Sequence, residues 1–298
     1  MAIYILPFEK MHGLGNDFIL IHEKHLPQNI NEQNLAKILC NRHYSIGADG
    51  LIIVKNSLTN SSEADFVWSY INSDGSYGQM CGNGMRCFAK YVFDRGLTNK
   101  SEFTVETLAG IMQPSIQPDG QIKVNMGNPK LKPSEIPLSI ELNAEQLIDY
   151  KIQILDQEFS FTPVSMGNPH AIVFLNNLAE FENLNLEKYG SVFEKHNYFP
   201  EKTNVEFAFV QDQNIIDLKV WERGCGITLA CGTGACATVV AAHLKNLISA
   251  QGQLIQVNLP GGSLNIEWNK ENNNIYMTGS AESVFIGQLE IDLLDQIN

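Results

Sequence analysis

An internal duplication is the feature that most constrains how this chain can fold. Cys81-Gly82-Asn83-Gly84 and Cys231-Gly232-Thr233-Gly234 share a Cys-Gly-x-Gly opening, and each is followed by a helix-like segment. Upstream, Gly15-Asn16-Asp17-Phe18 and Gly167-Asn168-Pro169-His170 each lead into a strand-like segment. The asparagine precedes the cysteine by 65 residues in the first copy (81 − 16) and by 63 in the second (231 − 168). The repeat predicts two similar domains facing each other across a cleft.

Short β-branched or aromatic runs, separated by Gly, Asn or Pro, make up most of the remaining pattern. The runs are 17–21, 51–54, 66–71, 103–106, 122–125, 171–175, 205–210, 215–221 and 255–259. Such runs at short spacing are typical of largely antiparallel sheets, because parallel strands need longer crossovers.

Two helices are expected directly after the duplicated turns. Apolar residues recur at helical spacing in both: Met85, Phe88, Ala89, Val92 and Phe93 in the first, and Cys236, Val239, Val240, His243 and Leu244 in the second. Gly96 marks the end of the first helix. Each helix is therefore expected to bury one apolar face.

The length of 298 residues suits about two domains. Turn residues crowd together at 126–133, which places the boundary there. We predict an N-terminal half over 1–130 that carries Cys81 and a C-terminal half over 131–280 that carries Cys231. The last strand-like run, 284–293, has no place in the second repeat, so residues 281–298 are expected to complete the first half.

Charge and N-terminal composition exclude several kinds of partner. The formal net charge of −13 disfavours nucleic acid, whose binding depends on clustered Lys and Arg. The N-terminus lacks the basic region and the long apolar run of a signal peptide. The uncharged stretch 224–242 is rich in glycine at its start, so we interpret it as a buried turn and helix rather than a membrane span. We expect a cytoplasmic protein with no membrane or nucleic-acid partner.

A cysteine in a glycine-rich turn that starts a helix has two chemical uses. Unpaired backbone N–H groups and the positive end of the helix dipole make the turn an anion site, suited to a carboxylate. The same position can lower a thiol pKa from about 8.5 towards 3.5 to 7.5. Two such thiols on opposite sides of one stereocentre can remove a proton from one face and deliver one to the other. Cys81 and Cys231 therefore predict inversion of an amino acid.

Less specific interpretations apply to other cysteines and to other ligands. A cysteine near a helix start is more often a small buried apolar side chain, and we interpret Cys40, Cys87, Cys225 and Cys236 in that way. The cysteine spacings do not fit the usual zinc pattern, so no metal is expected. Neither turn matches a nucleotide-binding loop.

The residues resemble the diaminopimelate epimerase family over most of the chain. The shared motifs occur in the family's order: Met11-His12-Gly13-Leu14-Gly15-Asn16-Asp17-Phe18, Asn72-Ser73-Asp74-Gly75-Ser76, Cys81-Gly82-Asn83-Gly84-Met85-Arg86-Cys87, Met166-Gly167-Asn168-Pro169-His170, Thr203-Asn204-Val205, Glu222-Arg223-Gly224 and Ala230-Cys231-Gly232-Thr233-Gly234-Ala235. The resemblance implies two α/β domains of the α+β type, each a mainly antiparallel sheet or barrel around one central helix. It also implies an active site in the interdomain cleft.

The resemblance further implies roles for individual residues and an enzyme without a cofactor. Cys81 and Cys231 match the catalytic acid/base pair, supported by His170 and Glu222. The matched substrate-binding positions are Asn16, Asn72, Gly82, Asn83, Asn168, Asn204, Glu222, Arg223, Gly232 and Thr233. The family suggests a homodimer with Tyr276 at the interface. The implied reaction is epimerisation of LL-2,6-diaminopimelate to the meso form, in lysine and peptidoglycan precursor synthesis.

Three positions depart from the family pattern, and three other functions stay open. Gly50 stands where some members have a substrate-contacting Gln, Ile227 where Glu is usual, and Met85 where Ala is frequent. A proline or hydroxyproline racemase would usually have His at the position of Asn83. An isomerase similar to phenazine-biosynthesis proteins would lack the cysteine pair. A noncatalytic amino-acid-binding protein would not need both thiols.

Overall fold

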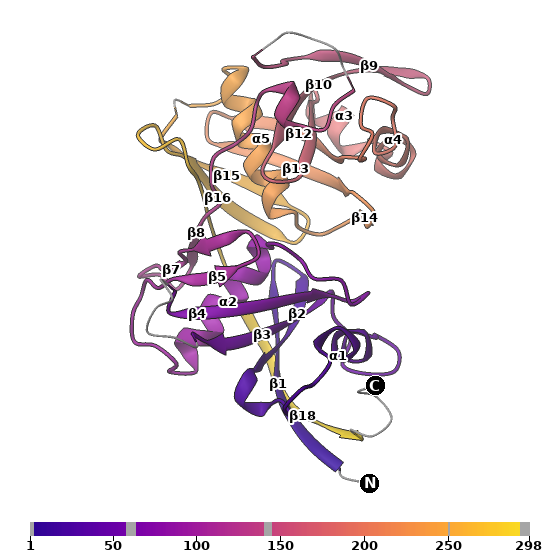
Figure 1. Ribbon diagram of the computed structural model, residues 1–298. Coiled ribbons are helices and arrows are strands. Elements are labelled where there is room, and N and C mark those ends of the chain that lie inside the picture. Colours follow the sequence, from indigo (N-terminus) through magenta and orange to yellow (C-terminus); the bar gives the residue numbers. More distant parts are fainter. Residues whose placement is uncertain (1–2, 58–63, 140–144, 250, 293–298) are drawn as a thin grey trace. The chain divides into compact units, whose positions relative to one another are not determined.

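The computed structural model describes residues 3–57, 64–139, 145–249 and 251–292 (Figure 1). The chain divides into two compact units, one of Met1–Val124 with Gly279–Asn298 and one of Asn125–Thr278. Residues 293–298, the end of the segment predicted to complete the first half, lie outside the described residues, as do Met1 and Ala2. Each unit is considered by itself below.

The first unit is built on a sheet with the strand order β18-β1-β2-β3-β4-β5-β6. Its elements are β1 (Ile3–Gly13), β2 (Asn16–His22), η1 (Glu23–His25), α1 (Glu32–Leu39), β3 (Gly50–Asn56), β4 (Phe66–Asn72), α2 (Gly82–Asp94), β5 (Val105–Thr107), β6 (Gly110–Met112), β7 (Ser115–Ile116), β8 (Ile122–Asn125) and β18 (Glu282–Asp292). The late strand β18 pairs antiparallel with β1, from Ile3 opposite Asp292 to His12 opposite Glu282 (Figure 1). The last described strand is thus an integral part of the first unit.

The second unit has the strand order β17-β16-β15-β13-β12-β11-β10-β9, with β14 beside β13. Its elements are η2 (Pro133–Glu135), β9 (Tyr150–Ile154), β10 (Gln157–Ser165), β11 (Pro169–Phe174), α3 (Leu178–Glu182), α4 (Leu186–Phe193), β12 (Asn204–Asp212), β13 (Ile215–Glu222), β14 (Gly226–Ile227), α5 (Gly232–Leu244), β15 (Leu254–Leu259), β16 (Gly262–Trp268) and β17 (Ile275–Gly279).

The two units repeat one pattern of strand pairing, which confirms the predicted fold class. β1 and β2 pair antiparallel, β2 and β3 parallel across α1, β3 and β4 antiparallel, and β4 and β5 parallel across α2. The second unit gives the same series with β10, β11, β12, β13 and β15, where α3 and α4 stand for α1 and α5 stands for α2. Helical crossovers explain the parallel pairs within mainly antiparallel sheets.

The register of the strands identifies equivalent positions in the two units. Phe18 on β2 pairs with Gly50 on β3, and His170 on β11 pairs with Asn204 on β12. Ile52 lies two residues after Gly50 on β3, and Glu206 lies two residues after Asn204 on β12, so each is on the same face of its sheet as the residue pair before it. Phe18 and Ile52 therefore correspond to His170 and Glu206.

The two predicted helices are present, but they are buried to different extents. α2 packs against β1, β2 and β3 and buries the predicted apolar side chains except Phe93, which is 38% exposed. α5 packs against β10, β11, β12 and β16, and every residue from Gly234 to Ala242 is buried. The predicted apolar face of α5 is buried, and the burial extends to its other sides because small and apolar residues occupy them as well.

The uncharged stretch 224–242 lies partly in this core helix. Among the described residues, no helix combines the length and the apolar character needed to cross a membrane.

Candidate active site

Each of the two predicted catalytic cysteines is the N-cap residue of the long helix of its unit. Both cysteines have extended backbone angles. The Sγ of Cys81 accepts a hydrogen bond from the backbone N–H of Gly84 at 3.4 Å, and the Sγ of Cys231 accepts one from Gly234 at 3.3 Å. The sulfur atoms thus occupy the place where Ser or Asp side chains usually cap a helix. Each sulfur lies at the positive end of a helix dipole.

In the first unit, an asparagine accepts hydrogen bonds around Cys81. The Cys81 thiol donates to Oδ1 of Asn16 at 3.7 Å, and Nδ2 of Asn83 donates to the same oxygen at 3.1 Å. Oδ1 of Asn83 in turn accepts from Nη2 of Arg86 at 3.0 Å. The Arg86 side chain is fully buried, and its Nε donates to the carbonyl of Ser280 at 3.0 Å. The buried guanidinium thereby fixes the amide of Asn83 in the first turn of α2.

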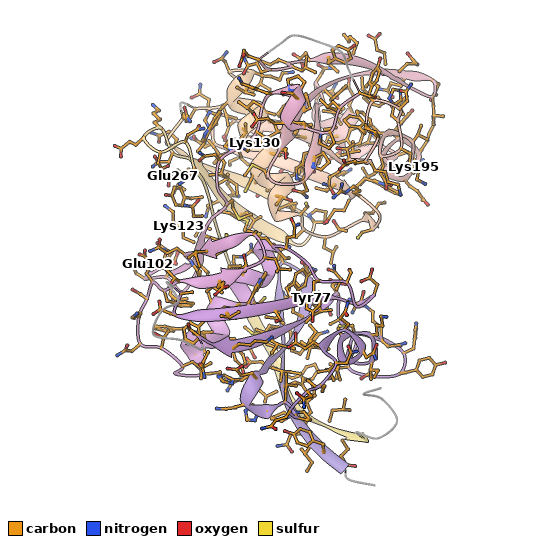
Figure 2. All side chains as sticks on the ribbon, in the orientation of Figure 1. Tyr77, Glu102, Lys123, Lys130, Lys195 and Glu267 are labelled. Atoms are coloured by element: carbon orange, nitrogen blue, oxygen red, sulfur yellow. The ribbon has the colours of Figure 1, made fainter. Side chains whose placement is uncertain are left out.

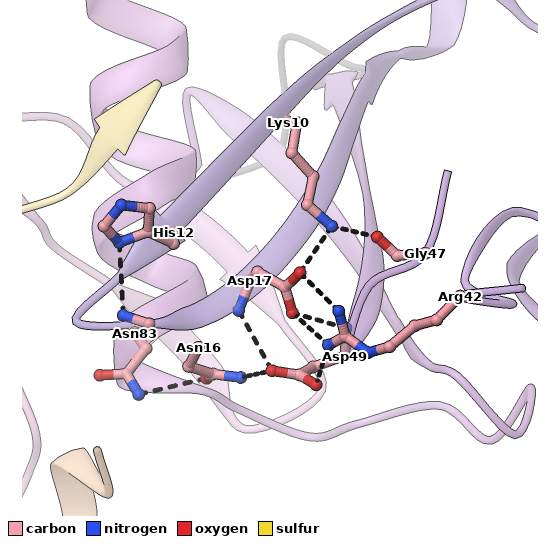
Figure 3. A network of polar contacts seen from close by, with 9 residues as sticks. Lys10, His12, Asn16, Asp17, Arg42, Gly47, Asp49 and Asn83 are labelled. Atoms are coloured by element: carbon pink, nitrogen blue, oxygen red, sulfur yellow. Dashed lines mark hydrogen bonds and ion pairs between the residues drawn. The ribbon is translucent and has the colours of Figure 1, made fainter. Parts of the chain in front are cut away.

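Charged residues hold Asn16 from the other side (Figure 3). Nδ2 of Asn16 donates to Asp49 at 2.7 Å, and the guanidinium of Arg42 joins Asp49 to Asp17 at 2.7 and 2.6 Å. Lys10 forms an ion pair with Asp17 at 2.6 Å. Burial opposes ionisation of Asp17, but hydrogen bonds from Arg42 and Lys10 outweigh it and hold its pKa well below the usual range. The start of β2 is therefore fixed by ion pairs.

In the second unit, hydrogen bonds connect a buried carboxylate to Cys231. Nδ1 of His170 lies 2.7 Å from Oε1 of Glu206, and both side chains are fully buried. Nε2 of His170 lies 3.0 Å from Oδ1 of Asn168, and Nδ2 of Asn168 donates to Oγ1 of Thr233 at 3.3 Å. Oγ1 of Thr233 lies 3.6 Å from the sulfur of Cys231. Four predicted site residues thus meet here.

The environment of Cys231 favours the thiol over the thiolate. Burial raises the pKa of Cys231 well above the usual value, and the charges of Glu222 and Glu206 raise it further. Hydrogen bonds from Thr233 and Gly234 act in the opposite direction. The expected lowering by the helix N-terminus is therefore outweighed at this cysteine, because desolvation penalises the thiolate more strongly.

Three further predicted residues of the second unit, Asn204, Glu222 and Arg223, lie close together. Asn204 donates to the carbonyl of Pro169 at 2.9 Å and accepts from the backbone N–H of Arg223 at 2.9 Å. The side chain of Arg223 donates to the carbonyl of Glu201 at 3.2 Å, and Thr228 donates to Glu222 at 2.5 Å. Asn204 thus fixes the peptide group that joins Glu222 to Arg223, two residues of opposite charge.

Two predicted residues lie apart from these groups. In the first unit, Asn72 at the end of β4 donates to the hydroxyl of Ser76 at 3.0 Å. Tyr276 lies on β17, and its hydroxyl accepts a hydrogen bond from Asn272 at 2.9 Å.

The three departures from the family pattern have different settings. A β-carbon on Gly50 would lie 2.6 Å from the ring of Tyr70, so the aromatic ring occupies the space that a Gln would enter. The loop that follows β4 folds back along this strand, where Tyr77, labelled in Figure 2, forms an isolated antiparallel β-bridge with Ile71. Met85 is fully buried in α2, whereas Ile227 is 56% exposed on β14.

Three of the four cysteines predicted to be buried are buried. Cys40, Cys87 and Cys236 are enclosed. The prediction is wrong for Cys225, which is exposed because it lies in the turn between β13 and β14 rather than in a helix.

Two buried residues that position site residues, Arg86 in the first unit and Glu206 in the second, were assigned no role from the sequence. Arg86 was part of a recognised motif but had no predicted role. Glu206 had a detectable signal, because it is a carboxylate within the apolar run of β12 between Val205 and Phe207. Charged residues are almost never fully buried unless they are paired.

Comparisons with known proteins agree with this arrangement. The sequence matches the protein family described as Diaminopimelate epimerase over residues 8–132 and 162–284. A diaminopimelate epimerase of Methanococcus maripaludis is 47% identical over 292 residues, covering 96% of this chain and 100% of the relative. One of a Synechococcus species is 45% identical over 283 residues, covering 95% and 97%.

Solved structures with low sequence identity share the fold. A hydroxyproline epimerase from Agrobacterium vitis superposes with a TM-score of 0.70 at 14% identity, covering 99% of this chain and 95% of that one. A PhzF-family phenazine biosynthesis protein from Bacillus anthracis gives 0.68 at 18% identity, with coverages of 98% and 100%. The family match and the near full-length relatives go further than the fold: the chain is an isomerase that belongs to the diaminopimelate epimerase family.

Proposed function

We propose that the protein epimerises LL-2,6-diaminopimelate to meso-diaminopimelate without pyridoxal phosphate, with Cys81 and Cys231 as the two acid/base groups. The observation that carries the proposal is the matched position of the two sulfurs. Each caps the helix of a duplicated unit and accepts a backbone N–H at 3.3 to 3.4 Å. The names of the near full-length relatives support the choice of substrate.

The chemistry needs one thiolate and one thiol in each turnover. The thiolate removes the α-proton from one face of the substrate, and the thiol delivers its own proton to the opposite face of the carbanion. One thiol is formed and one is consumed, so the protein ends with the two roles exchanged. No net proton is gained or lost, and the reverse reaction uses the exchanged roles.

The first turns of α2 and α5 supply the electrostatic part of the mechanism. The α-proton of an amino acid is far less acidic than a thiol, so the negative charge that spreads to the carboxylate must be stabilised. First-turn N–H groups have no partner within their helix. In this proposal, those of Gly82, Asn83, Gly232 and Thr233 bind the α-carboxylate, and their fixed dipoles are strongest where charge develops.

The distal half of the substrate needs groups of both charges. Diaminopimelate carries a second ammonium and a second carboxylate. Arg223 can pair bidentately with that carboxylate, and Glu222 can accept from an ammonium. Asn204 supports this role because it binds the backbone N–H of Arg223. Asn16, Asn72 and Asn168 complete the proposed polar contacts.

The proposal includes the wider setting that the family suggests. The reaction belongs to lysine and peptidoglycan precursor synthesis in the cytoplasm. The enzyme acts as a homodimer with Tyr276 at the interface, and it needs no cofactor, nucleic acid or membrane. Sedimentation of the wild type and of Tyr276→Asp would test the dimer.

The first experiment follows isotope and stereochemistry together. Reduced, metal-free protein is incubated with LL-diaminopimelate in D₂O without pyridoxal phosphate. Chiral chromatography measures the meso product, and NMR measures deuterium at the α-carbon. Meso product with one solvent deuteron is expected. No product and no exchange from folded protein would overturn the substrate assignment, and proline and hydroxyproline would then be tested.

The chain offers matched controls for the two thiols. Cys87 lies in α2 and Cys236 in α5, and both are buried in the same helices that Cys81 and Cys231 cap. Cys81→Ala and Cys231→Ala are expected to lose at least about a thousandfold in kcat, since the acid or base is gone. Cys87→Ala and Cys236→Ala are expected to keep most of it. Equal losses in all four variants would contradict the assignment.

A further inference from the structure

The buried pair of His170 and Glu206 is more than the fold requires. In the first unit the equivalent positions hold Phe18 and Ile52, which are both fully buried and apolar. The neighbouring glycines confirm the equivalence. A β-carbon on Gly84 would contact Ile52, and one on Gly234 would contact Glu206. The same sheet and helix therefore pack around an apolar pair in one unit and an ionisable pair in the other.

Burying an ionisable pair is costly, so its presence calls for a functional reason. Replacing such a pair by apolar residues of similar volume is often neutral or stabilising. Oε2 of Glu206 is buried and meets no side-chain donor among the described residues. A structural role alone would not explain a buried carboxylate at a position where the first unit has an apolar side chain.

The contacts fix where the protons lie. Oδ1 of Asn168 faces Nε2 of His170, and an amide oxygen can only accept, so Nε2 carries a proton. Nδ2 of Asn168 then donates to Oγ1 of Thr233. The hydroxyl hydrogen of Thr233 is free to donate to Cys231. Every donor in this series points towards the sulfur.

The equivalent asparagine of the first unit is turned the other way. Oδ1 of Asn16 faces Cys81 and accepts from its thiol and from Asn83. Phe18, in the place of His170, has no N–H to offer to that oxygen. In the first unit Asp49 and Asn83 fix the amide of Asn16 in this orientation, whereas in the second unit His170 faces the amide oxygen of Asn168.

We propose that Glu206 is a positioning residue of the second half-site, which holds His170 through Nδ1 and so turns the donors of Asn168 and Thr233 towards the sulfur of Cys231. The inference rests on the proposed function for its kinetic consequence. The donors stabilise the thiolate that forms when Cys231 gives up its proton. A proton shared between His170 and Glu206 limits the negative charge beside that sulfur.

The electrostatics of the site are consistent with this role. Burial raises the pKa of Glu206, which favours sharing of a proton with His170. A fully charged Glu206 raises the pKa of Cys231. A carboxylate that fixes the tautomer of a catalytic histidine can be worth about 10⁴ in kcat in other enzymes.

The test compares Glu206→Ile and Glu206→Gln with the wild type. ¹⁵N NMR of the histidine side chains, with His170 assigned by loss of its signals in His170→Asn, reports the tautomer without any substrate. We expect Nε2 of His170 to be protonated in the wild type, with a proton shared between Nδ1 and Glu206, and a mixture of tautomers in Glu206→Ile. The kcat of Glu206→Ile should fall at least about tenfold with KM changed less than about twofold, and Glu206→Gln should lie between.

Two controls separate positioning from unfolding. The double variant His170→Phe with Glu206→Ile restores the apolar pair of the first unit and is expected to fold with a Tm at least as high as Glu206→Ile. Glu9→Gln makes the same chemical change at another buried carboxylate, which is paired with Arg95 in the first unit, and should leave the His170 signals unchanged.

The outcomes distinguish this inference from the proposed function. Wild-type protein that does not turn over diaminopimelate would overturn the proposed function, while the NMR result would still decide whether Glu206 holds His170. An unchanged tautomer, or an unchanged kcat in Glu206→Ile with an active wild type, would overturn the inference.

Discussion

Gly234 lies so close to Glu206 that a β-carbon on the glycine would be 2.7 Å from Oε1 of the carboxylate. The same atom would be 3.2 Å from Sγ of Cys231. In the first unit, a β-carbon on Gly84 would meet Ile52 at 3.2 Å and the ring of Trp68 at 3.4 Å. The two glycines of the duplicated turn therefore have different tolerance, because only one faces a buried polar group.

Alanine at these two positions should give opposite results. Both glycines lie in the first turn of a helix, where alanine gains up to about 1 kcal/mol in helix propensity. Gly84→Ala should therefore keep its Tm and most of its kcat. Gly234→Ala should displace Glu206 and lose at least about tenfold in kcat. Thermal unfolding and steady-state kinetics of both variants check this, and similar losses in the two would contradict it.

Position 50 should accept a larger side chain only when Tyr70 is replaced by a smaller residue. A β-carbon on Gly50 would lie 2.6 Å from the Tyr70 ring, and one on Gly78 would lie 2.3 Å from it. Gly50→Ala should cost about 1–3 kcal/mol in the free energy of unfolding, as overpacking does. Combining it with Tyr70→Ala should remove most of that cost. A double-mutant cycle with no coupling between the two positions would show that the ring is not the obstacle.

Periodicity and turn residues were sufficient to locate most strands and both long helices. Eight of the nine predicted runs fall wholly or largely in strands, since local alternation reports the pleat directly, and of the run 103–106 only Val105 and Glu106 lie in β5. The longer strands that were missed are β1, β9, β10, β16 and β17. Both β10 and β16 do carry apolar/polar alternation, in Phe159-Ser160-Phe161-Thr162 and in Leu264-Asn265-Ile266-Glu267-Trp268, which the prediction did not use. The complete burial of α5 depends on strands far away in the chain, which local spacing cannot show.

The predicted site residues could be located by motif, but their interactions could not. Sequence offsets paired Asn16 with Asn168, yet the opposite orientations of their amides depend on contacts with Asp49 and Asn83 in the first unit and with His170 in the second. His170 was expected to support catalysis, whereas the partner that fixes it, Glu206, lies 36 residues away. The pKa of Cys231 also followed burial rather than the helix dipole alone.

Acid should weaken the first unit through Asp17. Its pKa in the folded protein lies below the value of about 3.9 for an unfolded Asp. Its ion pairs therefore stabilise the fold above about pH 4, and the stabilisation is lost as the pH falls towards the folded pKa. Asp17→Asn should lower the free energy of unfolding by about 2 kcal/mol at pH 7, and the difference from wild type should shrink below pH 4.

A surface ion pair provides the control for Asp17. Asp156 pairs with Lys188 at 2.8 Å, but its side chain is 68% exposed. Asp156→Asn should leave unfolding unchanged at both pH values, because solvent screens such pairs. A constant difference between Asp17→Asn and wild type from pH 7 to pH 3 would contradict the role given to the Asp17 carboxylate.

The six cysteines should react with iodoacetamide in an order set by exposure and ionisation. Cys225 is exposed, whereas burial raises the pKa of Cys40 to about 12. At pH 7.5, mass spectrometry should find Cys225 alkylated first, while Cys40, Cys87 and Cys236 react only after unfolding. Cys225→Ser should remove the fast phase and keep the epimerase activity. Inactivation that follows alkylation of Cys225 in the wild type, with Cys81 and Cys231 unmodified, would place this exposed thiol in the reaction and contradict the assignment of the helix-capping pair.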